Sequence, residues 1–371
     1  MGEKNNMGSI ESIFSEQNLL NYADACLELA VQLPDSYSKN NFDTLVIPSR
    51  GAVPFFLGMV YSLDKFSKSE LSETHTCFYN RLSVQDDLQI LMTPDFTSNH
   101  NHSLEESVSV LLVPFTADLN IEQFYVKEKN EEYTKKTRKY WAEFTASLFM
   151  PNDKRINNPY FSSFTNVILR KVEKRPKLAE YYERFPEIKR FAIIDTVISG
   201  RASTDILSSF DNISKEENNP DIQPASFLII DENGAKLKRL FSQYLNRKKI
   251  AGKVSMIKTA RIVSEDEGSS LLGVLATIYP SIMWASKNLE TSGDEFFVGA
   301  GSWRLSPHTS LERIYRHNFD SFMQLVYRAI DTRFSFLYSQ DKGFSESYNV
   351  FSETCKDFVQ LGIQNNILDK G

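Results

Sequence analysis

One segment constrains the fold of this chain more than any other: residues 190–209, which read RFAIIDTVISGRASTDILSS. Phe191 to Ile194 form a compact apolar run that is typical of a buried strand, and the apolar residues from Thr204 to Phe210 have helical spacing. A polar stretch with one glycine, Gly200, joins the two runs, and a second apolar run, Ser226 to Ile230, follows the helix. The segment therefore predicts strand, loop, helix and strand, which is the repeating unit of a parallel sheet.

The same alternation occurs earlier in the chain. Thr44 to Ile47 is a short apolar run that ends at Pro48, and the apolar stretch Val53 to Leu63 beyond the next loop has the length and composition of a helix. Val108 to Val113 has the composition of a further buried strand. We therefore expect an α/β fold built on a parallel sheet with right-handed crossovers.

Helical patterns surround and interrupt this core. Residues 9–33 have mostly helical apolar spacing, and Pro34 with Asp35 should break that helix. A densely charged stretch at 126–149 predicts a long helix with an aromatic face, and 311–338 predicts another helix. We therefore expect three regions: a helical N-terminal segment at 1–41, a core at 42–232 with an insertion at about 118–188, and a mainly helical C-terminal region at 233–371.

Composition indicates the cellular location of the protein and the kinds of partner to expect. The three cysteines, Cys26, Cys77 and Cys355, are far apart and form no CxxC pair, so no disulfide framework or zinc site is indicated and a cytoplasmic location is expected. No stretch approaches the roughly 20 apolar residues that span a bilayer, so we expect no membrane partner. A net charge of −6 gives no indication of a nucleic-acid partner, but it still allows a local basic patch that holds a phosphate.

Two loops carry the groups that a phosphate ligand needs. In the later loop Ser199, Ser203 and Thr204 supply hydroxyl groups, and the N–H groups of the following helix add the positive end of its dipole. Gly200 allows the backbone to approach an anion, and Arg201 adds a fixed charge with fork geometry. With Ala202 between them, these residues form the predicted phosphate-binding set: Ser199, Gly200, Arg201, Ala202, Ser203 and Thr204.

The two loops, in this order, resemble those of the type I phosphoribosyltransferases. Ser199-Gly200-Arg201 stands where that family has a Thr-Gly turn that opens a helix. Asp195 lies five positions before Gly200, which is the spacing of the family's second acidic residue, a contact of the ribose hydroxyls. The earlier loop, Ser49, Arg50, Gly51 and Ala52, matches the family's diphosphate loop. The resemblance covers roughly residues 42–231.

This resemblance implies a phosphoribosyltransferase-like core that binds phosphoribosyl diphosphate or a nucleotide together with Mg²⁺ and transfers phosphoribose to a nitrogen base. Asp195 would be the catalytic residue, the 199–204 loop would hold the 5′-phosphate, and the 49–52 loop would hold the departing diphosphate. In the family a mobile loop between the two motifs closes over the ribose. Five cations of the insertion are candidates for that loop: Lys135, Lys136, Arg138, Lys154 and Arg155.

Two other interpretations stay open. Family members usually carry two adjacent acids at the strand end, whereas the neighbours of Asp195 are Ile194 and Thr196. A catalytically degenerate nucleotide sensor, or a regulatory or defence-system module that acts through a protein partner, accounts for this difference. The third interpretation is an unrelated α/β protein whose turns imitate the motifs.

Two further stretches are not assigned a site. The glycine-rich stretch 299–304 is interpreted as a plain turn and not as a second phosphate loop, and the HNH sequence at 100–102 is too short to specify a metal site.

Overall fold

The structure is a computed structural model of the 371-residue chain, and it describes residues 15–68, 73–82, 108–113, 115, 127–162, 188–262 and 309–338. The helices and strands follow in the order α2 (Glu16–Asn40), β1 (Thr44–Ile47), η1 (Arg50–Ala52), α3 (Val53–Lys68), α4 (Glu73–Arg81), β2 (Ser109–Leu112), α5 (Lys127–Ser147), α6 (Asn152–Arg155), β3 (Phe191–Val197), α9 (Arg201–Glu216), η3 (Pro220–Ile222), β4 (Ala225–Ile230), η4 (Asp231–Gly234), α10 (Arg239–Ile250), β5 (Val254–Lys258) and α13 (Thr309–Tyr338).

One parallel sheet organises these elements. Its strand order is β2-β1-β3-β4-β5, and every neighbouring pair is parallel, which confirms the predicted α/β fold. All five carboxyl ends therefore lie at one edge of the sheet. From β1 the chain goes to β2 on one side, and it then places β3 on the other side of β1. The direction in which strands are added thus reverses between β1 and β3, which is a topological switch point.

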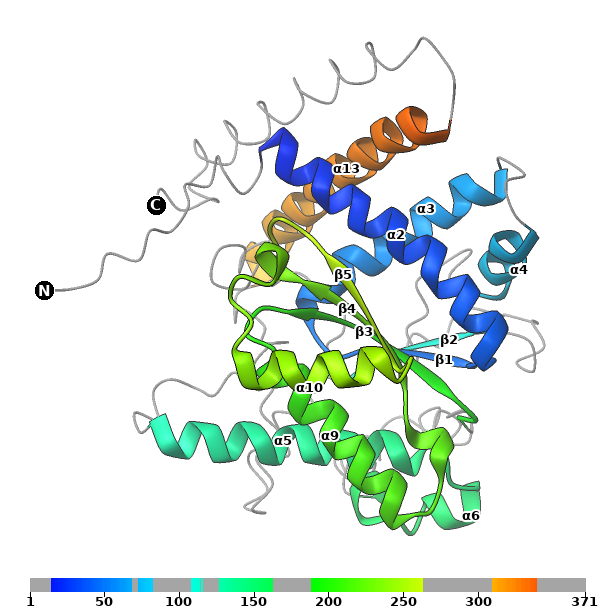
Figure 1. The fold of residues 1–371 in the computed structure, drawn as a ribbon, viewed down its shortest axis with the longest axis vertical. Coiled ribbons are helices and arrows are strands. Elements are labelled where there is room, and N and C mark those ends of the chain that lie inside the picture. The colour runs from blue at the N-terminus through cyan, green and yellow to red at the C-terminus, as the bar shows by residue number, and fades with distance from the viewer. Residues whose placement is uncertain are drawn as a thin grey trace, which may run out of the picture.

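Helices cover both faces of the sheet (Figure 1). On one face α2 packs against α3 and α13 and also contacts β4 and β5. On the other face α9 contacts β3 and packs against α5 and α10. The amphipathic pattern of α9 explains how it covers this face, because Ile206, Phe210 and Ile213 are buried at helical spacing. The ring of Phe210 packs edge to face on Phe191 of β3, with 5.0 Å between ring centroids.

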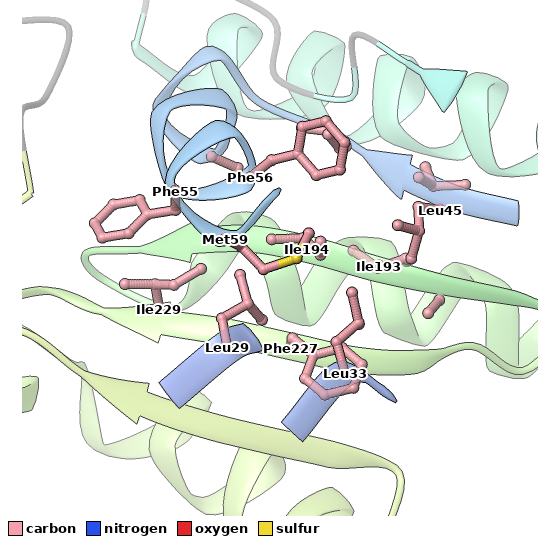
Figure 2. Packing of buried hydrophobic residues seen from close by; sticks show 14 of the residues in the cluster. Leu29, Leu33, Leu45, Phe55, Phe56, Met59, Ile193, Ile194, Phe227 and Ile229 are labelled. Atoms are coloured by element: carbon pink, nitrogen blue, oxygen red, sulfur yellow. The ribbon is translucent and has the colours of Figure 1, made fainter. Parts of the chain in front are cut away.

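The core between the sheet and the first helical layer is made of large aliphatic and aromatic side chains (Figure 2). Leu29 of α2 and Met59 of α3 are fully buried beside Ile194 of β3. Burial of each such side chain contributes about 1.5–3 kcal/mol relative to exposure. Helix α2 therefore belongs to the α/β core and closes one face of its sheet.

Helix α2 does not end where the sequence predicts. It continues through Pro34 to Asn40, so the predicted break at Pro34 is wrong. A proline inside a helix removes one backbone hydrogen bond and crowds the preceding turn. Leu29, Leu33 and Pro34 are all buried, and this packing outweighs the local cost. The helix ends instead at Asn41, whose left-handed backbone (φ 48) lets its N–H donate to the Tyr37 carbonyl at 2.7 Å.

The sheet also extends past the boundary predicted at residue 232. Strand β5 lies in the region predicted as mainly helical, and it pairs with β4 with Ser226 opposite Val254. Its five residues do not alternate strictly between buried and exposed, so they carry no period-2 pattern from which a strand could be predicted. α10 and α13 are helical, as expected for this region.

The insertion contributes a packed helix. Tyr140, Trp141, Phe144 and Leu148 of the stretch predicted as an aromatic face are buried, and α5 packs against α9. The insertion thus adds a helix beside the amino terminus of α9. No helix in the described part of the chain is long and apolar enough to cross a membrane.

Candidate functional site

The two loops predicted to bind phosphate lie side by side at the carboxyl edge of the sheet. β1 and β3 are parallel neighbours, with Thr44 opposite Phe191 and Val46 opposite Ile193. The loop after β1 leads through η1 into α3, and the loop after β3 leads into α9. Both loops therefore flank the switch point, where ligands of open α/β sheets bind.

Asp195 joins the two loops. Its Oδ1 accepts a hydrogen bond of 2.9 Å from the Ser49 hydroxyl, in the loop after β1. Its Oδ2 accepts a hydrogen bond of 2.8 Å from the Ser203 hydroxyl, in the first turn of α9. The Thr196 N–H adds a third, donating to Oδ1 at 2.8 Å. Both oxygens of the carboxylate are thus bound by donors of the chain itself.

Asp195 is enclosed as well as bound. It is only 2% exposed, and Ser203 is 3% exposed. Burial raises the pKa of the Asp195 carboxyl above its usual range, while the hydrogen bonds from Ser203 and Ser49 oppose that shift. The geometry gives Asp195 a positioning role, because it fixes the loop after β1 and the start of α9 relative to β3. The prediction that Asp195 contacts a ribose stays a prediction, and it would require these hydrogen bonds to open.

The glycines of both loops are required by close packing within the chain. A Cβ atom on Gly51 would lie 2.8 Å from the Thr196 hydroxyl, so Gly51 lets the first loop lie directly on β3. Gly200 has a left-handed φ of 82°, and a Cβ there would lie 2.8 Å from Leu237 and 3.0 Å from Phe241. The Lys238 N–H donates to the Ser199 carbonyl at 3.2 Å, which fixes this segment on the loop. Gly200 is therefore required for packing within the chain, and its predicted role beside an anion stays a prediction.

The amino terminus of α9 retains donors for an anion. Gly200 is the N-cap and has no side chain, so no side-chain oxygen in the described chain caps the helix. The N–H groups of the first turn, contributed by Arg201, Ala202 and Ser203, have no carbonyl one turn earlier within the helix. The Thr204 hydroxyl is buried and has no hydrogen-bond partner among the described residues. Of the hydroxyl groups predicted to bind phosphate, that of Ser203 already donates to Asp195, whereas that of Thr204 makes no hydrogen bond with a described residue.

Two arginines stand beside this helix terminus. Arg201 is 35% exposed, and its Nε lies 4.0 Å from Asp205 Oδ2. Arg138 of α5 is 9% exposed, and its Nη1 lies 2.5 Å from the same carboxylate oxygen. Burial lowers the pKa of Arg138, and Asp205 opposes that shift. Asp205 therefore holds a buried arginine of the insertion next to the predicted phosphate loop.

The cations of the insertion, which the sequence left as equal candidates for a ligand contact, differ in burial and in hydrogen-bond partners. Arg138 reaches α9, where its guanidinium donates to Asp205. Lys135 and Lys154 are exposed. Arg155 is buried, and its guanidinium donates to the Met150 carbonyl, so it stabilises the turn after α5. Asp205 was not predicted, and its only sequence signal is the i,i+4 spacing from Arg201.

Some predicted features fall outside the described part of the chain. They are the side chains of Arg50 and Lys136, the HNH sequence at 100–102 and the glycine-rich stretch 299–304. The backbone of Arg50 lies in η1, and Ala52 is fully buried at its end.

The Mg²⁺ ion implied by the family resemblance finds no matching side chains in this geometry. Within the described ranges no group of three or more His, Cys, Asp or Glu side chains could hold a metal ion. Asp195 is the only acid of the later loop that the resemblance offers, and its oxygens are bound by Ser49, Ser203 and the Thr196 N–H. Mg²⁺ prefers several oxygen ligands in octahedral geometry. We therefore derive no step through a metal.

Comparison of the chain with family models, with curated proteins and with solved structures finds no match in any of the three.

Proposed function

We propose that this chain binds a phosphate-bearing, nucleotide-sized ligand, either phosphoribosyl diphosphate or a nucleotide, at the switch point between β1 and β3. The observation that carries the proposal is the convergence there of both loops, which Asp195 links through Ser49 and Ser203. The loop after β3 ends at an α9 terminus without a side-chain cap. Such a terminus offers N–H donors and the positive end of a helix dipole to an anion.

The arginines support the same ligand class. Arg201 is partly exposed and is the first residue of α9, so its guanidinium stands beside the loop that is proposed to hold the phosphate. Arg138 is buried and paired with the same carboxylate, so it offsets the negative charge of Asp205 beside the helix terminus. Two guanidinium groups beside a helix terminus suit the geometry and the charge of a phosphate group.

We further propose that the chain acts as a binding module of phosphoribosyltransferase-like design and does not transfer phosphoribose. Transfer requires a carboxylate that faces the sugar while positive charge develops on it. The single acid of the later loop is instead enclosed by hydroxyl and N–H donors of the chain. In this proposal Asp195 preserves the shape of the ligand site, and the ligand state is passed to a partner protein.

Calorimetric titration tests the binding site. Phosphoribosyl diphosphate, AMP and ATP are each titrated into the wild type and Arg201→Gln, with and without MgCl₂. We expect Arg201→Gln to weaken binding about 10-fold or more, because a hydrogen bond between charged groups contributes about 1.5–3 kcal/mol. Arg190→Gln is the matched control, because Arg190 is exposed and precedes the opposite end of β3, where it pairs with Asp221. It should bind like the wild type.

A diphosphate-release assay over a panel of nitrogen bases tests the second part of the proposal. Binding without release supports a binding module. Base-dependent release would show that the chain is a transferase, and it would overturn the positioning role of Asp195 if Asp195→Asn abolished release without loss of binding. Absence of binding of every phosphorylated ligand would overturn the site itself.

A further inference from the structure

A second charged feature lies on α10 and the turn that follows it. Residues 235–258 contain eight cations and no Asp or Glu: Lys236, Lys238, Arg239, Arg247, Lys248, Lys249, Lys253 and Lys258. Because the whole chain has a net charge of −6, the remaining residues carry a net −14. This segment therefore carries a positive charge that no acid within it offsets, in a protein that is acidic as a whole.

Most of these cations face solvent. α10 buries Leu245 and packs against α9 and β5 with that side. Lys248 pairs with Asp211, and Lys236 pairs with Glu232. Six other cations are exposed and have no ion pair within the described part of the chain. One of them, Lys258, ends β5. We name the other five the basic edge: Lys238, Arg239, Arg247, Lys249 and Lys253.

Helix stability does not account for the basic edge. Cations in the last turn of a helix interact favourably with its dipole, which explains Arg247 and Lys249. The dipole disfavours cations at the amino terminus, where Lys238 is the N-cap and Arg239 is the first helical residue. No acid stands in the first turn to offset them. Two exposed cations at the positive end of a helix dipole destabilise the free protein, and a negatively charged partner would offset this unfavourable interaction.

The apolar and aromatic side chains of α10 indicate which kind of polyanion it could bind. Leu240 and Ile250 are 72% and 88% exposed, but they lie ten positions apart, about 15 Å along the helix, with Arg247 on the same side between them. The helix thus has no continuous apolar face for a membrane surface. Its aromatic residues, Phe241 and Tyr244, are partly buried and cannot stack on unpaired bases.

We infer that the basic edge is a docking surface for the phosphate backbone of double-stranded nucleic acid, which it binds without sequence preference. Arg239 and Arg247 are eight positions apart, about 12 Å along the helix, which is close to the width of the DNA major groove. The exposed amides of Gln243 and Asn246 lie between the cations and add hydrogen-bond donors for phosphate oxygens. The amino-terminal end of this surface adjoins the proposed ligand site, because the Lys238 N–H donates to the Ser199 carbonyl, whereas Arg247 and Lys249 lie in the last turn of α10.

Fluorescence anisotropy with a labelled DNA duplex of about 20 base pairs, at KCl concentrations from about 50 to 200 mM, tests the inference. The full-length wild type should bind with an affinity that falls steeply with salt. In Arg239→Gln/Arg247→Gln/Lys249→Gln binding should weaken at least about 10-fold, and the salt slope should fall by about 0.9 for each phosphate contact removed. The control Lys39→Gln/Lys139→Gln/Lys215→Gln makes the same change in charge at exposed sites of α2, α5 and α9, and it should bind within about twofold of wild type.

The outcomes separate the possible partners. Lack of duplex binding by wild type, or an equal loss in the control variant, would overturn the inference. Binding only to vesicles that contain phosphatidylserine would assign the surface to a membrane instead. If the triple variant melts early by circular dichroism, Arg247→Gln alone provides the measurement, with a salt slope shallower by about 0.9. Titration of the phosphorylated ligands into Arg247→Gln, whose charge lies in the last turn of α10, gives an independent check on the ligand site.

Discussion

At the scale of single residues, Asp195 determines the geometry of the candidate site. A carboxylate at the end of a parallel strand is often exposed to ligand, but this one points to the face covered by α9. Phe191 shows this direction, because residues of one parity share a face and the Phe191 ring packs on Phe210 of α9. The sequence predicted a strand that ends at Ile194, whereas β3 continues to Val197 and Asp195 pairs with Leu228 of β4. Its hydrogen-bond partners could not be predicted from the spacing. Ser49 is 146 positions away in the sequence, and Ser203 belongs to the next helix, α9.

Removal of the Asp195 carboxylate should destabilise the protein. In Asp195→Ala the buried hydroxyls of Ser49 and Ser203 lose their acceptor, so we expect a loss of about 3 kcal/mol or more in the free energy of unfolding. Asp195→Asn keeps one acceptor oxygen and should lose less, about 1–3 kcal/mol at neutral pH. Urea denaturation measures both. Equal stability of Asp195→Ala and wild type would contradict the positioning role.

The pH dependence of this difference has a defined sign. Burial raises the folded-state pKa of Asp195 above the usual value of 3.8, so the folded protein holds this proton more tightly than the unfolded chain does. Its contribution to stability is greatest below about pH 4 and is lost as the pH rises toward the folded-state pKa. Relative to the non-titrating Asp195→Asn, wild type should therefore lose stability as the pH rises from about 4. The opposite slope would mean that hydrogen bonding outweighs burial.

At the scale of elements, the sequence located β1, β3, β4 and α9 because their apolar patterns agree with their environments. It did not locate β5, since a five-residue edge strand without alternation resembles a loop. It also ended α2 at Pro34, because local propensity does not register the packing of Leu33 on the sheet. The packing of Gly200 was not predicted, for a similar reason. The sequence identifies a glycine in a turn, but it does not identify Leu237 and Phe241 as the groups that lie against it.

The packing of α10 on the loop after β3 can be tested through Gly200. Gly200→Ala combines a left-handed φ of 82° with a 2.8 Å approach to Leu237, so we expect a loss of about 2–4 kcal/mol in the free energy of unfolding. Gly252→Ala is the matched control, because its φ is also left-handed, at 70°, but nothing lies within 4 Å of the added Cβ. It should cost only about 1 kcal/mol, the price of the backbone strain. Equal losses in chemical denaturation would mean that Leu237 yields without cost.

At the scale of the whole molecule, α13 connects the end of the described chain to its beginning. Phe322, Val326 and Ile330 are buried, and α13 packs on both α2 and α3. Polar contacts fix its position on this surface. Arg333 donates to Asp24 of α2 at 2.8 Å, a contact between residues 309 positions apart. Contacts of such separation are not visible in local sequence patterns, so the sequence predicted this helix but not where it packs.

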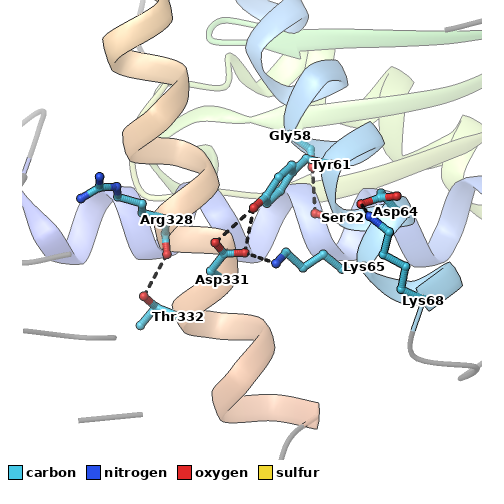
Figure 3. Close-up of polar contacts among 9 residues, drawn as sticks. All are labelled: Gly58, Tyr61, Ser62, Asp64, Lys65, Lys68, Arg328, Asp331 and Thr332. Carbon is cyan, nitrogen blue, oxygen red and sulfur yellow. Dashed lines mark hydrogen bonds and ion pairs between the residues drawn. The ribbon is translucent and has the colours of Figure 1, made fainter. Parts of the chain in front are cut away.

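The centre of the second polar contact is Asp331 (Figure 3). The Tyr61 hydroxyl lies 3.1 Å from both carboxylate oxygens, and Lys65 Nζ lies 2.5 Å from Oδ1. The Tyr61 ring stacks on Tyr327 of α13, with 4.4 Å between ring centroids. One acid of α13 thus fixes two adjacent turns of α3.

Asp331→Ala should therefore lower the free energy of unfolding by about 1–2 kcal/mol, because it removes the partner of a half-buried hydroxyl and of an ammonium group together. The side chains of Lys65 and Asp331 are 30% and 40% exposed, so solvent screening keeps the loss below that of a buried pair. Asp221→Ala breaks the more exposed pair with Arg190, whose side chains are 51% and 46% exposed, and it should cost under about 1 kcal/mol. A double-mutant cycle of Asp331→Ala with Tyr61→Phe should give a coupling energy of about 0.5–1 kcal/mol in urea denaturation. A coupling near zero would mean that apolar packing alone positions α13, and that the Tyr61–Asp331 contact has no part in joining the two ends of the fold.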